Sequence, residues 1–402
     1  MLRIDDKRRT NSKNEQMQIE MLRCQLGRNP RLNSWSIVVG VGWLMVSACG
    51  TNEVADQNAE AKTLVLTESM RIGDEAEGDT VFFSNIWDIA VDSRGRLFVA
   101  DFAMYGFRVF TSDGSLIREI GREGEGPGEF SIAPHLYVSP QDSVYAYDLD
   151  SDRLTVYAPS GDVLAYTMKL PTDEISGARP TDILAYLETG LLFEYMRVLP
   201  RGSENEVDGM LEIKLVDHSG QFLRDSLVLT PSMQMTTISD DGFSIPFPRQ
   251  FGRRSLLALG SDDLIYHGWT DEISIRALAI DGSTANEFAV SHTSVPVTSE
   301  EKSARAAGYP ENWREELRQD MPDTKPAFNA MVPDDQGQLW FRLSWPEGAL
   351  ETEWIVVEAE SGSVVAKTTL PTGVGLDTVR GGKAYGTPDD DNAVVVVWDI
   401  AE

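Results

Sequence analysis

Short apolar runs separated by turn residues fill the stretch between Ile86 and Phe130. Four such runs occur there, at residues 89–91, 97–99, 107–110 and 116–120. Asp and Gly stand between the runs, and both residue types accept the backbone angles that tight turns require. This pattern predicts four short strands that form one small antiparallel sheet.

The same pattern returns 47 residues further along the chain without a gap, so that Asp101 falls on Asp148 and Gly114 on Gly161. Weaker copies begin near residues 182, 255, 327 and 376. Repeats of this length are typical of propeller blades and solenoids, and strand-rich units without a helical period favour the propeller. Because Asp101 and Asp148 recur in register at strand ends, we expect their side chains to cap neighbouring loops.

The last copy leaves room for three strands before the chain ends, whereas Thr63–Ile72 is a strand that stands upstream of the first copy. Pairing this strand with the last copy would close the ring and remove two exposed sheet edges. The sequence therefore predicts an all-β fold over residues 62–402. The predicted architecture is a six-bladed β-propeller with four-stranded blades, whose N-terminal strand completes the last blade.

Two stretches depart from the repeat. Residues 231–254 contain prolines and are predicted to be a connection between the third and fourth units. Residues 298–321 predict a small helical insertion, because Thr298 and Glu301 have the spacing of a capping box, and a second short helix follows over 311–318. Such a pair of helices would lie outside the sheet ring, either over the mouth of the channel or, as we favour, against the rim.

The repeating unit resembles a known bacterial family. Its strands and turns read as an apolar strand, D-x-x-G, L-F-V-A-D, R-V-F and x-D-G, and the first two units are joined by G-R-E-G-E-G-P-G-E-F. This pattern is similar to that of the NHL-type six-bladed β-propeller lipoproteins of bacteria. The likeness is sharp over residues 86–170 and looser elsewhere.

An apolar run without charges, Trp35–Ala48, precedes the propeller. Fourteen residues are too few to span a bilayer comfortably, but they suit the apolar core of a signal peptide, and arginines precede them. The run ends in V-S-A-C-G, which resembles the lipobox of bacterial lipoproteins. That resemblance implies a signal peptide at 1–48 and lipidation of Cys49, followed by a flexible tether at 49–61. The alternative is a buried core strand with a chance cysteine.

The segment before the apolar run is long for a signal peptide that starts at Met1. A start at Met21 would give ordinary proportions, which leaves open whether residues 1–20 are translated. The only cysteines are Cys24 and Cys49. Cleavage before Cys49 would remove the first, and lipid would block the second, so the mature chain is predicted to form no disulfide.

Composition and charge narrow the class of partner. The 402 residues are 42% hydrophobic, which is enough for a sizeable core, and the formal net charge is -29. After residue 48 the chain holds 27 basic and 60 acidic residues. Such a surface repels nucleic acid and anionic lipid headgroups, so membrane contact is predicted only through the lipid on Cys49. The acidic residues are scattered, which favours a solvating surface over a cation site.

Several familiar motifs are incomplete. The glycine-rich segment 121–128 lacks the Gly-Lys-Ser/Thr ending of a phosphate loop, and its glutamates would repel phosphate. An EF-hand beginning at Asp148 fails at its sixth and twelfth positions, which are Arg153 and Pro159. The four histidines form no zinc motif, and there is no G-x-S-x-G elbow. We therefore interpret these segments as structural.

One set of polar residues remains as a candidate site. The first strand of each unit should be innermost, and the residue that opens it should face the central channel, where propellers commonly bind ligands. These candidate ligand-binding residues are Asp88, His135, Asp182, Arg254 (or its neighbour Ser255), Asn329 and Asp377. Six-bladed lactonases hold a calcium ion in this channel with carboxylates and amides, and that likeness implies Asp88, Asp182, Asn329 and Asp377 as candidate metal ligands. The alternative is that these side chains only solvate the channel.

A rigid ring with variable loops and a polar channel suits recognition. The sequence favours a lipid-anchored β-propeller of the cell envelope, periplasmic or surface-exposed, that acts as a binding or scaffolding module for a protein, peptide or glycan partner. The alternative function is a calcium-dependent lactonase- or lyase-like enzyme with its site in the central channel. Which membrane carries the anchor is left open.

Overall fold

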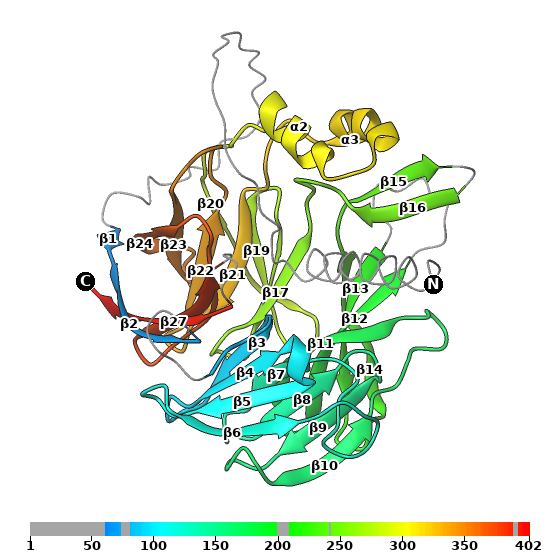
Figure 1. Cartoon of the computed structure of the whole chain (residues 1–402), viewed down its shortest axis with the longest axis vertical. Helices are drawn as coiled ribbons and strands as arrows, with labels where there is room; N and C mark the ends of the chain where they lie inside the picture. The colour runs from blue at the N-terminus through cyan, green and yellow to red at the C-terminus, as the bar shows by residue number, and fades with distance from the viewer. Residues whose placement is uncertain (1–60, 74–80, 199–208, 241–242, 389–392) are drawn as a thin grey trace, which may run out of the picture.

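The computed structural model describes residues 61–73, 81–198, 209–240, 243–388 and 393–402. The predicted signal peptide, Cys49 and nearly all of the predicted tether lie outside these residues. In the part of the chain that the structure describes, six four-stranded antiparallel sheets follow one another around a ring (Figure 1). This confirms the predicted six-bladed β-propeller.

Each blade runs from an innermost first strand to an outermost fourth strand, and the strands pair in that order. Blades 1 to 3 are built from β3 (Ile86–Val91), β4 (Leu97–Asp101), β5 (Gly106–Phe110) and β6 (Leu116–Gly121); β7 (His135–Val138), β8 (Val144–Asp148), β9 (Arg153–Tyr157) and β10 (Leu164–Lys169); and β11 (Arg179–Leu187), β12 (Gly190–Val198), β13 (Gly209–Val216) and β14 (Phe222–Pro231).

Blades 4 to 6 are built from β17 (Ser255–Leu259), β18 (Ile265–Trp269), β19 (Ile273–Leu278) and β20 (Thr284–Val290); β21 (Phe328–Pro333), β22 (Gln338–Leu343), β23 (Glu351–Glu358) and β24 (Val364–Pro371); and β25 (Val374–Arg380), β26 (Lys383–Pro388), β27 (Val395–Ala401) and β2 (Val65–Ile72). The short β1 (Lys62–Thr63) pairs in parallel with the edge strand β24. The innermost strands β3, β7, β11, β17, β21 and β25 each contact the next around the full circle, so they enclose the central channel.

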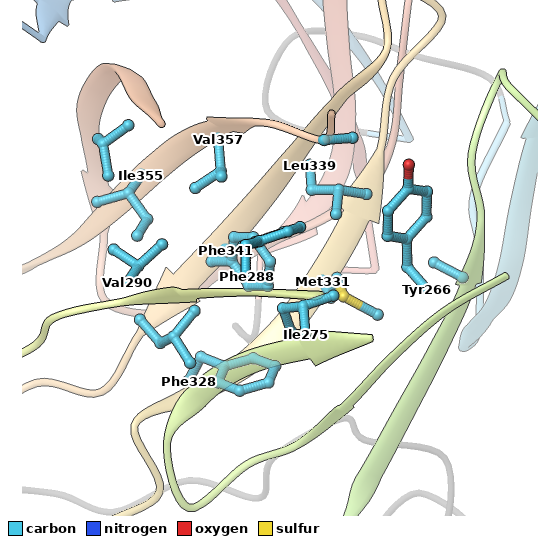
Figure 2. Close-up of a cluster of buried hydrophobic side chains, with 14 of the residues drawn as sticks. Tyr266, Ile275, Phe288, Val290, Phe328, Met331, Leu339, Phe341, Ile355 and Val357 are labelled. Carbon is cyan, nitrogen blue, oxygen red and sulfur yellow. The ribbon is translucent and has the colours of Figure 1, made fainter. Parts of the chain in front are cut away.

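Apolar side chains fill the space between neighbouring blades. The described residues contain one buried apolar cluster for each of the six blade-to-blade contacts. Figure 2 shows the cluster between blades 4 and 5, where Phe288 meets Phe328 and Phe341. The rings of Phe328 and Phe341 are 5.4 Å apart in an edge-on arrangement. Each sheet is therefore buried on both faces, which explains its nearly continuous apolar strands.

The predicted closure of the ring is confirmed. β2 pairs antiparallel with β27, so that Val65 lies opposite Ala401 and Ile72 opposite Val395. Ile72 is buried in the cluster that joins blade 6 to blade 1. β2, from the beginning of the described chain, is thus the outermost strand of the last blade, and the two ends of the propeller are held together.

The predicted helical insertion is also confirmed, together with its cap. α2 (Ser299–Ala307) begins with the predicted capping box, in which Thr298 and Glu301 exchange hydrogen bonds. A short 3-10 turn, η3 (Glu311–Trp313), leads into α3 (Arg314–Asp320). Figure 1 shows both helices at the outer edge of the ring, outside the six blades. None of the helices in the described ranges has the length and apolar character needed to cross a bilayer.

The connection predicted over residues 231–254 is more ordered than expected. It contains a two-stranded hairpin, β15 (Met235–Asp240) and β16 (Phe243–Pro248), that lies next to the helices in Figure 1. Ile238 and Phe247 pack on Leu317 and Met321 of the helical insertion. A lone hairpin is marginally stable, so its order depends on this packing against residues far away in the sequence.

Deleting Thr63–Ile72 should abolish soluble, cooperatively folding protein. The deletion removes the outermost strand of blade 6 and exposes β27 together with one side of the cluster that contains Ile72. Circular dichroism during thermal unfolding would measure the effect, with a chain that begins at Ala61 as the matched control. A deletion variant that unfolds at the same temperature as this control would contradict the structural importance of closure.

Candidate functional site

The innermost strands share a bulge near their beginning. In blades 1, 3, 5 and 6 the pairing of the first strand with the second skips one residue. The skipped residues are Trp87, Thr181, Asn329 and Asp377. A bulge redirects the side chains around it. Asn329 and Asp377 therefore occupy the bulge itself, whereas Asp88 and Asp182 occupy the position after it.

Asp88 and Asp182 adopt the same local geometry in blades 1 and 3. The Ile89 N–H donates to Asp88 Oδ1 at 2.8 Å, and the Ile183 N–H donates to Asp182 Oδ1 at 2.7 Å. The second oxygen of Asp88 accepts a hydrogen bond from the Leu136 N–H of blade 2 at 2.8 Å. Each carboxylate is thus fixed by its own strand, and Asp88 also links two blades.

His135 lies between these two carboxylates. Its Nδ1 is 3.5 Å from Asp182 Oδ1 and 3.9 Å from Asp88 Oδ2. The imidazole is buried, with the edge of Trp87 on one side at 5.4 Å and the stacked ring of Tyr147 at 6.4 Å on the other. The structure therefore brings Asp88, His135 and Asp182 together at the beginning of the innermost strands, as the 47-residue register predicts.

Glu194 joins this cluster and was not predicted. It lies on β12 directly opposite Asp182, and the Thr181 hydroxyl donates to its carboxylate at 3.1 Å. The sequence signal was a charged residue inside the apolar run L-L-F-E-Y-M. We call Asp88, His135, Asp182 and Glu194 the acidic cluster.

The acidic cluster holds carboxyl groups in an unfavourable environment. Burial raises the pKa of Asp182 to about 7, although its side chain keeps 41% of its exposed area. Burial also raises the pKa of Glu194 to about 7, and the nearby charge of Asp182 acts in the same direction. Strongly shifted carboxyls with a specific partner in a channel mark a candidate functional site.

The other predicted residues lie on the opposite half of the ring. Arg254 precedes β17, and its guanidinium donates to the backbone carbonyl of Asn329 at 2.6 Å, which links blade 4 to blade 5. Asp377 lies on β25, which contacts both β21 and β3. In the described ranges, no three His, Cys, Asp or Glu side chains are grouped as ligands for a metal ion.

Ser255 and His267 form a hydrogen-bonded pair whose arrangement suits a structural role rather than catalysis. The Ser255 hydroxyl donates to the Pro231 carbonyl at 2.7 Å and lies 2.9 Å from His267 Nε2. Arg276 approaches Nδ1 of the same ring at 3.3 Å, so this hydrogen-bond network assigns the imidazole proton to Nε2. Burial lowers the pKa of His267 to about 4, with Arg276 acting in the same direction. In a catalytic triad, Nε2 accepts the proton of the serine hydroxyl and a carboxylate lies at Nδ1. Here Nε2 carries the proton, and the cationic Arg276 lies at Nδ1.

The segments interpreted as structural have structural contacts. In the glycine-rich loop, Glu129 accepts hydrogen bonds from the Gly126 N–H and the Arg122 side chain. Asp101 accepts from the Ser84 and Ala103 backbone, and Asp148 caps the loop that contains Ser131 in the same way. These contacts confirm the predicted capping role of the repeated aspartates.

A pocket of about 290 Å³ lies at the other end of the innermost strands, between blades 2 and 3. Its lining residues are Tyr145, Tyr166, Tyr186 and His218. The ring of Tyr186 is 5.7 Å from that of Tyr145 and 5.4 Å from that of His218. The sequence did not predict this pocket, because its four lining residues come from three strands and one turn in two different blades.

Comparisons with known proteins support the fold. A family model, DUF5128, described as a 6-bladed beta-propeller matches residues 78–220, which span most of blades 1 to 3. No curated protein matches the sequence. A member of the DUF4221 family from Bacteroides vulgatus has a similar structure, with a TM-score of 0.52 and 9% identity over 85% of this chain and 99% of that chain.

Two further solved structures match over most of their length. A Bacteroides fragilis protein described as exported has a TM-score of 0.47 and 11% identity, over 86% of this chain and 98% of that chain. Virginiamycin B lyase from Staphylococcus aureus has a TM-score of 0.42 and 13% identity, over 84% of this chain and 100% of that chain. The protein is a six-bladed β-propeller, and the NHL-type likeness stays a prediction.

Asp182→Asn should raise the thermal stability by about 2 °C at pH 8 and by clearly less at pH 5. The folded carboxyl keeps its proton up to about pH 7, whereas an unfolded aspartate loses it near pH 4. The cost of charging Asp182 therefore destabilises the fold increasingly as pH rises between these values, and asparagine removes that cost. Melting temperatures at both pH values would measure it, with Glu188→Gln on the exposed turn as the control. An equal shift at pH 5 and pH 8 would contradict this assignment.

Proposed function

We propose that this protein is a lipid-anchored β-propeller of the bacterial cell envelope that binds a basic peptide segment of a partner protein at its channel. The observation that carries the proposal is the acidic cluster, in which two aspartates lie near a buried histidine and Glu194 lies opposite Asp182. Burial disfavours the charged forms of Asp182 and Glu194, and a cationic ligand would stabilise them.

The geometry supports recognition by a fixed site. Backbone N–H groups of Ile89, Leu136 and Ile183 hold the carboxylates of Asp88 and Asp182 before any ligand arrives. A preorganised site loses less side-chain freedom on binding, which favours affinity. A lysine or arginine side chain would supply the positive charge and the N–H donors that this cluster can accept. The predicted partner is a protein, a peptide or a glycan. The negative charge of the acidic cluster favours a protein or peptide over a neutral glycan.

The acidic cluster lies on the same side of the ring as the large insertions. First strands begin where the connections between blades arrive, and two of these connections carry the β15–β16 hairpin and the helices α2 and α3. These insertions pack on each other through Phe247, Leu317 and Met321. A partner that places a basic side chain into the channel from this side would therefore approach the end of the ring that carries the helices and the hairpin.

The replacement of Asp182 by Asn together with Glu194 by Gln should weaken the binding of trilysine by about tenfold at pH 8. The wild-type protein should bind trilysine more weakly at pH 5.5 than at pH 8, because both carboxyls, with pKa values of about 7, gain protons. Isothermal titration calorimetry would measure both effects. Glu174→Gln with Glu188→Gln, on exposed loops of the same blade, removes the same net charge as a control. Equal loss in both double variants would mean nonspecific attraction and would refute the site.

The proposed anchor rests on the sequence V-S-A-C-G at residues 46–50. Replacement of Cys49 by Ser should move the full-length protein from the detergent phase to the aqueous phase in Triton X-114 partitioning, because the lipid chains provide the membrane affinity. Mass spectrometry of the wild-type N-terminal peptide should find acyl chains on Cys49. An unmodified Cys49, or a Cys49→Ser variant that stays in the detergent phase, would refute the anchor.

A further inference from the structure

Exposed apolar side chains gather at one end of the outermost strands. Seven of them occupy the first positions of these strands, or the position just before, and keep 37% to 57% of their area exposed. They are Val65 on β2, Leu116 and Ile117 on β6, Val163 and Leu164 on β10, and Phe222 and Leu223 on β14. We call these seven residues the apolar arc.

The apolar arc covers four consecutive blades. β2, β6, β10 and β14 are the outermost strands of blades 6, 1, 2 and 3, and they follow one another along the outer edge of the ring in Figure 1. Blades 4 and 5 lack the feature, because β20 begins with the exposed polar Thr284 and β24 with the buried Val364. Scattered exposed apolar residues are ordinary, but equivalent positions on neighbouring blades place these together at one surface.

The chain that leads to the predicted lipid enters at the same end. In an antiparallel four-stranded blade, the fourth strand begins at the end that carries the turns between strands 1 and 2 and between strands 3 and 4. β2 begins there with Val65, a member of the apolar arc, and β1 lies just before it. Cys49 and Ala61 are twelve positions apart in the sequence, so the two residues can be at most about 40 Å apart. A lipid on Cys49 therefore holds this end of the ring near the bilayer.

Two arginines lie directly beside the apolar arc, at an end of the ring whose turns also carry aspartates. Arg118 follows Leu116 and Ile117 directly, and Arg224 follows Phe222 and Leu223, and both arginines are exposed. Arg118 also reaches Asp162 of the next blade at 2.5 Å. Apolar side chains beside arginines are the composition of surfaces that lie in the headgroup region of a membrane.

We propose that the apolar arc is a membrane-docking surface that lies against the same bilayer as the lipid on Cys49, so that the channel end with the acidic cluster faces away from that bilayer. This inference rests on the proposed lipid anchor. The lipid supplies the attachment, and the arc fixes the orientation of the ring. The tyrosine pocket between blades 2 and 3 opens at the same end, and tyrosine rings are enriched at membrane interfaces.

Site-specific fluorescence in liposomes tests the orientation. The full-length acylated protein, with its Cys49 blocked by lipid, would carry one added cysteine, Ile117→Cys or Leu164→Cys, labelled with a nitrobenzoxadiazole dye. Vesicles would contain phosphatidylethanolamine and phosphatidylglycerol with a doxyl-labelled lipid as quencher. We expect about a twofold loss of fluorescence at these two positions, because interfacial side chains enter the bilayer boundary.

Matched controls come from the opposite end of the ring. Ile175 and Leu350 are exposed apolar residues on loops at the other ends of the blades, and labels at Ile175→Cys and Leu350→Cys should stay unquenched. Equal quenching at all four positions, or none at positions 117 and 164, would overturn the inference. Protection of these two labels only when another envelope protein is added would overturn it in favour of a protein partner.

The failure of the anchor is distinguishable from the failure of the docking surface. Mass spectrometry of the same preparation reports acylation of Cys49. An unacylated protein overturns the anchor, and the orientation falls with it. If Cys49 is acylated but the labels at positions 117 and 164 stay in water, the anchor is supported and only the docking surface is refuted.

Discussion

The packing of blade against blade is the constraint on which the rest of this structure depends. Each sheet is covered on both faces, and six apolar clusters account for the contacts around the ring. An open ring would leave one face of blade 1 and one face of blade 6 in water, at about 25 cal/mol for each Å² of apolar surface. β2 resolves this by completing blade 6 and by placing Ile72 in the cluster beside blade 1. Closure is therefore a requirement of burial as well as of edge pairing.

Features with a local cause could be predicted from the sequence, and features with a distant cause could not. The turns, the capping aspartates and the box formed by Thr298 and Glu301 depend on residues a few positions apart, so their spacing specifies them. The hairpin over 235–248 depends on the burial of Ile238 and Phe247 against α3, which lies some 70 residues further along. No periodicity in the hairpin itself carries that information.

The candidate site shows the same division. Asp88, His135 and Asp182 were predicted because the 47-residue register holds through the first three blades, and the structure brings them together. In blades 5 and 6 the 47-residue register is lost, and the predicted residues Asn329 and Asp377 fall on the bulge itself, one position before the equivalent of Asp88. A bulge is a property of strand pairing, which a single sequence does not display. Glu194 was missed for a related reason, because it reaches the channel from the second strand of its blade.

The two ends of the ring are suited to different tasks by the lengths of their connections. The end with the turns inside each blade carries two- to six-residue links rich in Asp and Gly, so little chain projects from it. The other end carries the links between blades, which are long enough to hold a hairpin and two helices, and it also carries the acidic cluster. In the proposed orientation, a lipid attached before β2 brings the end with the short turns toward the membrane, because β2 begins at that end. In that orientation, the end of the channel with the acidic cluster faces away from the bilayer.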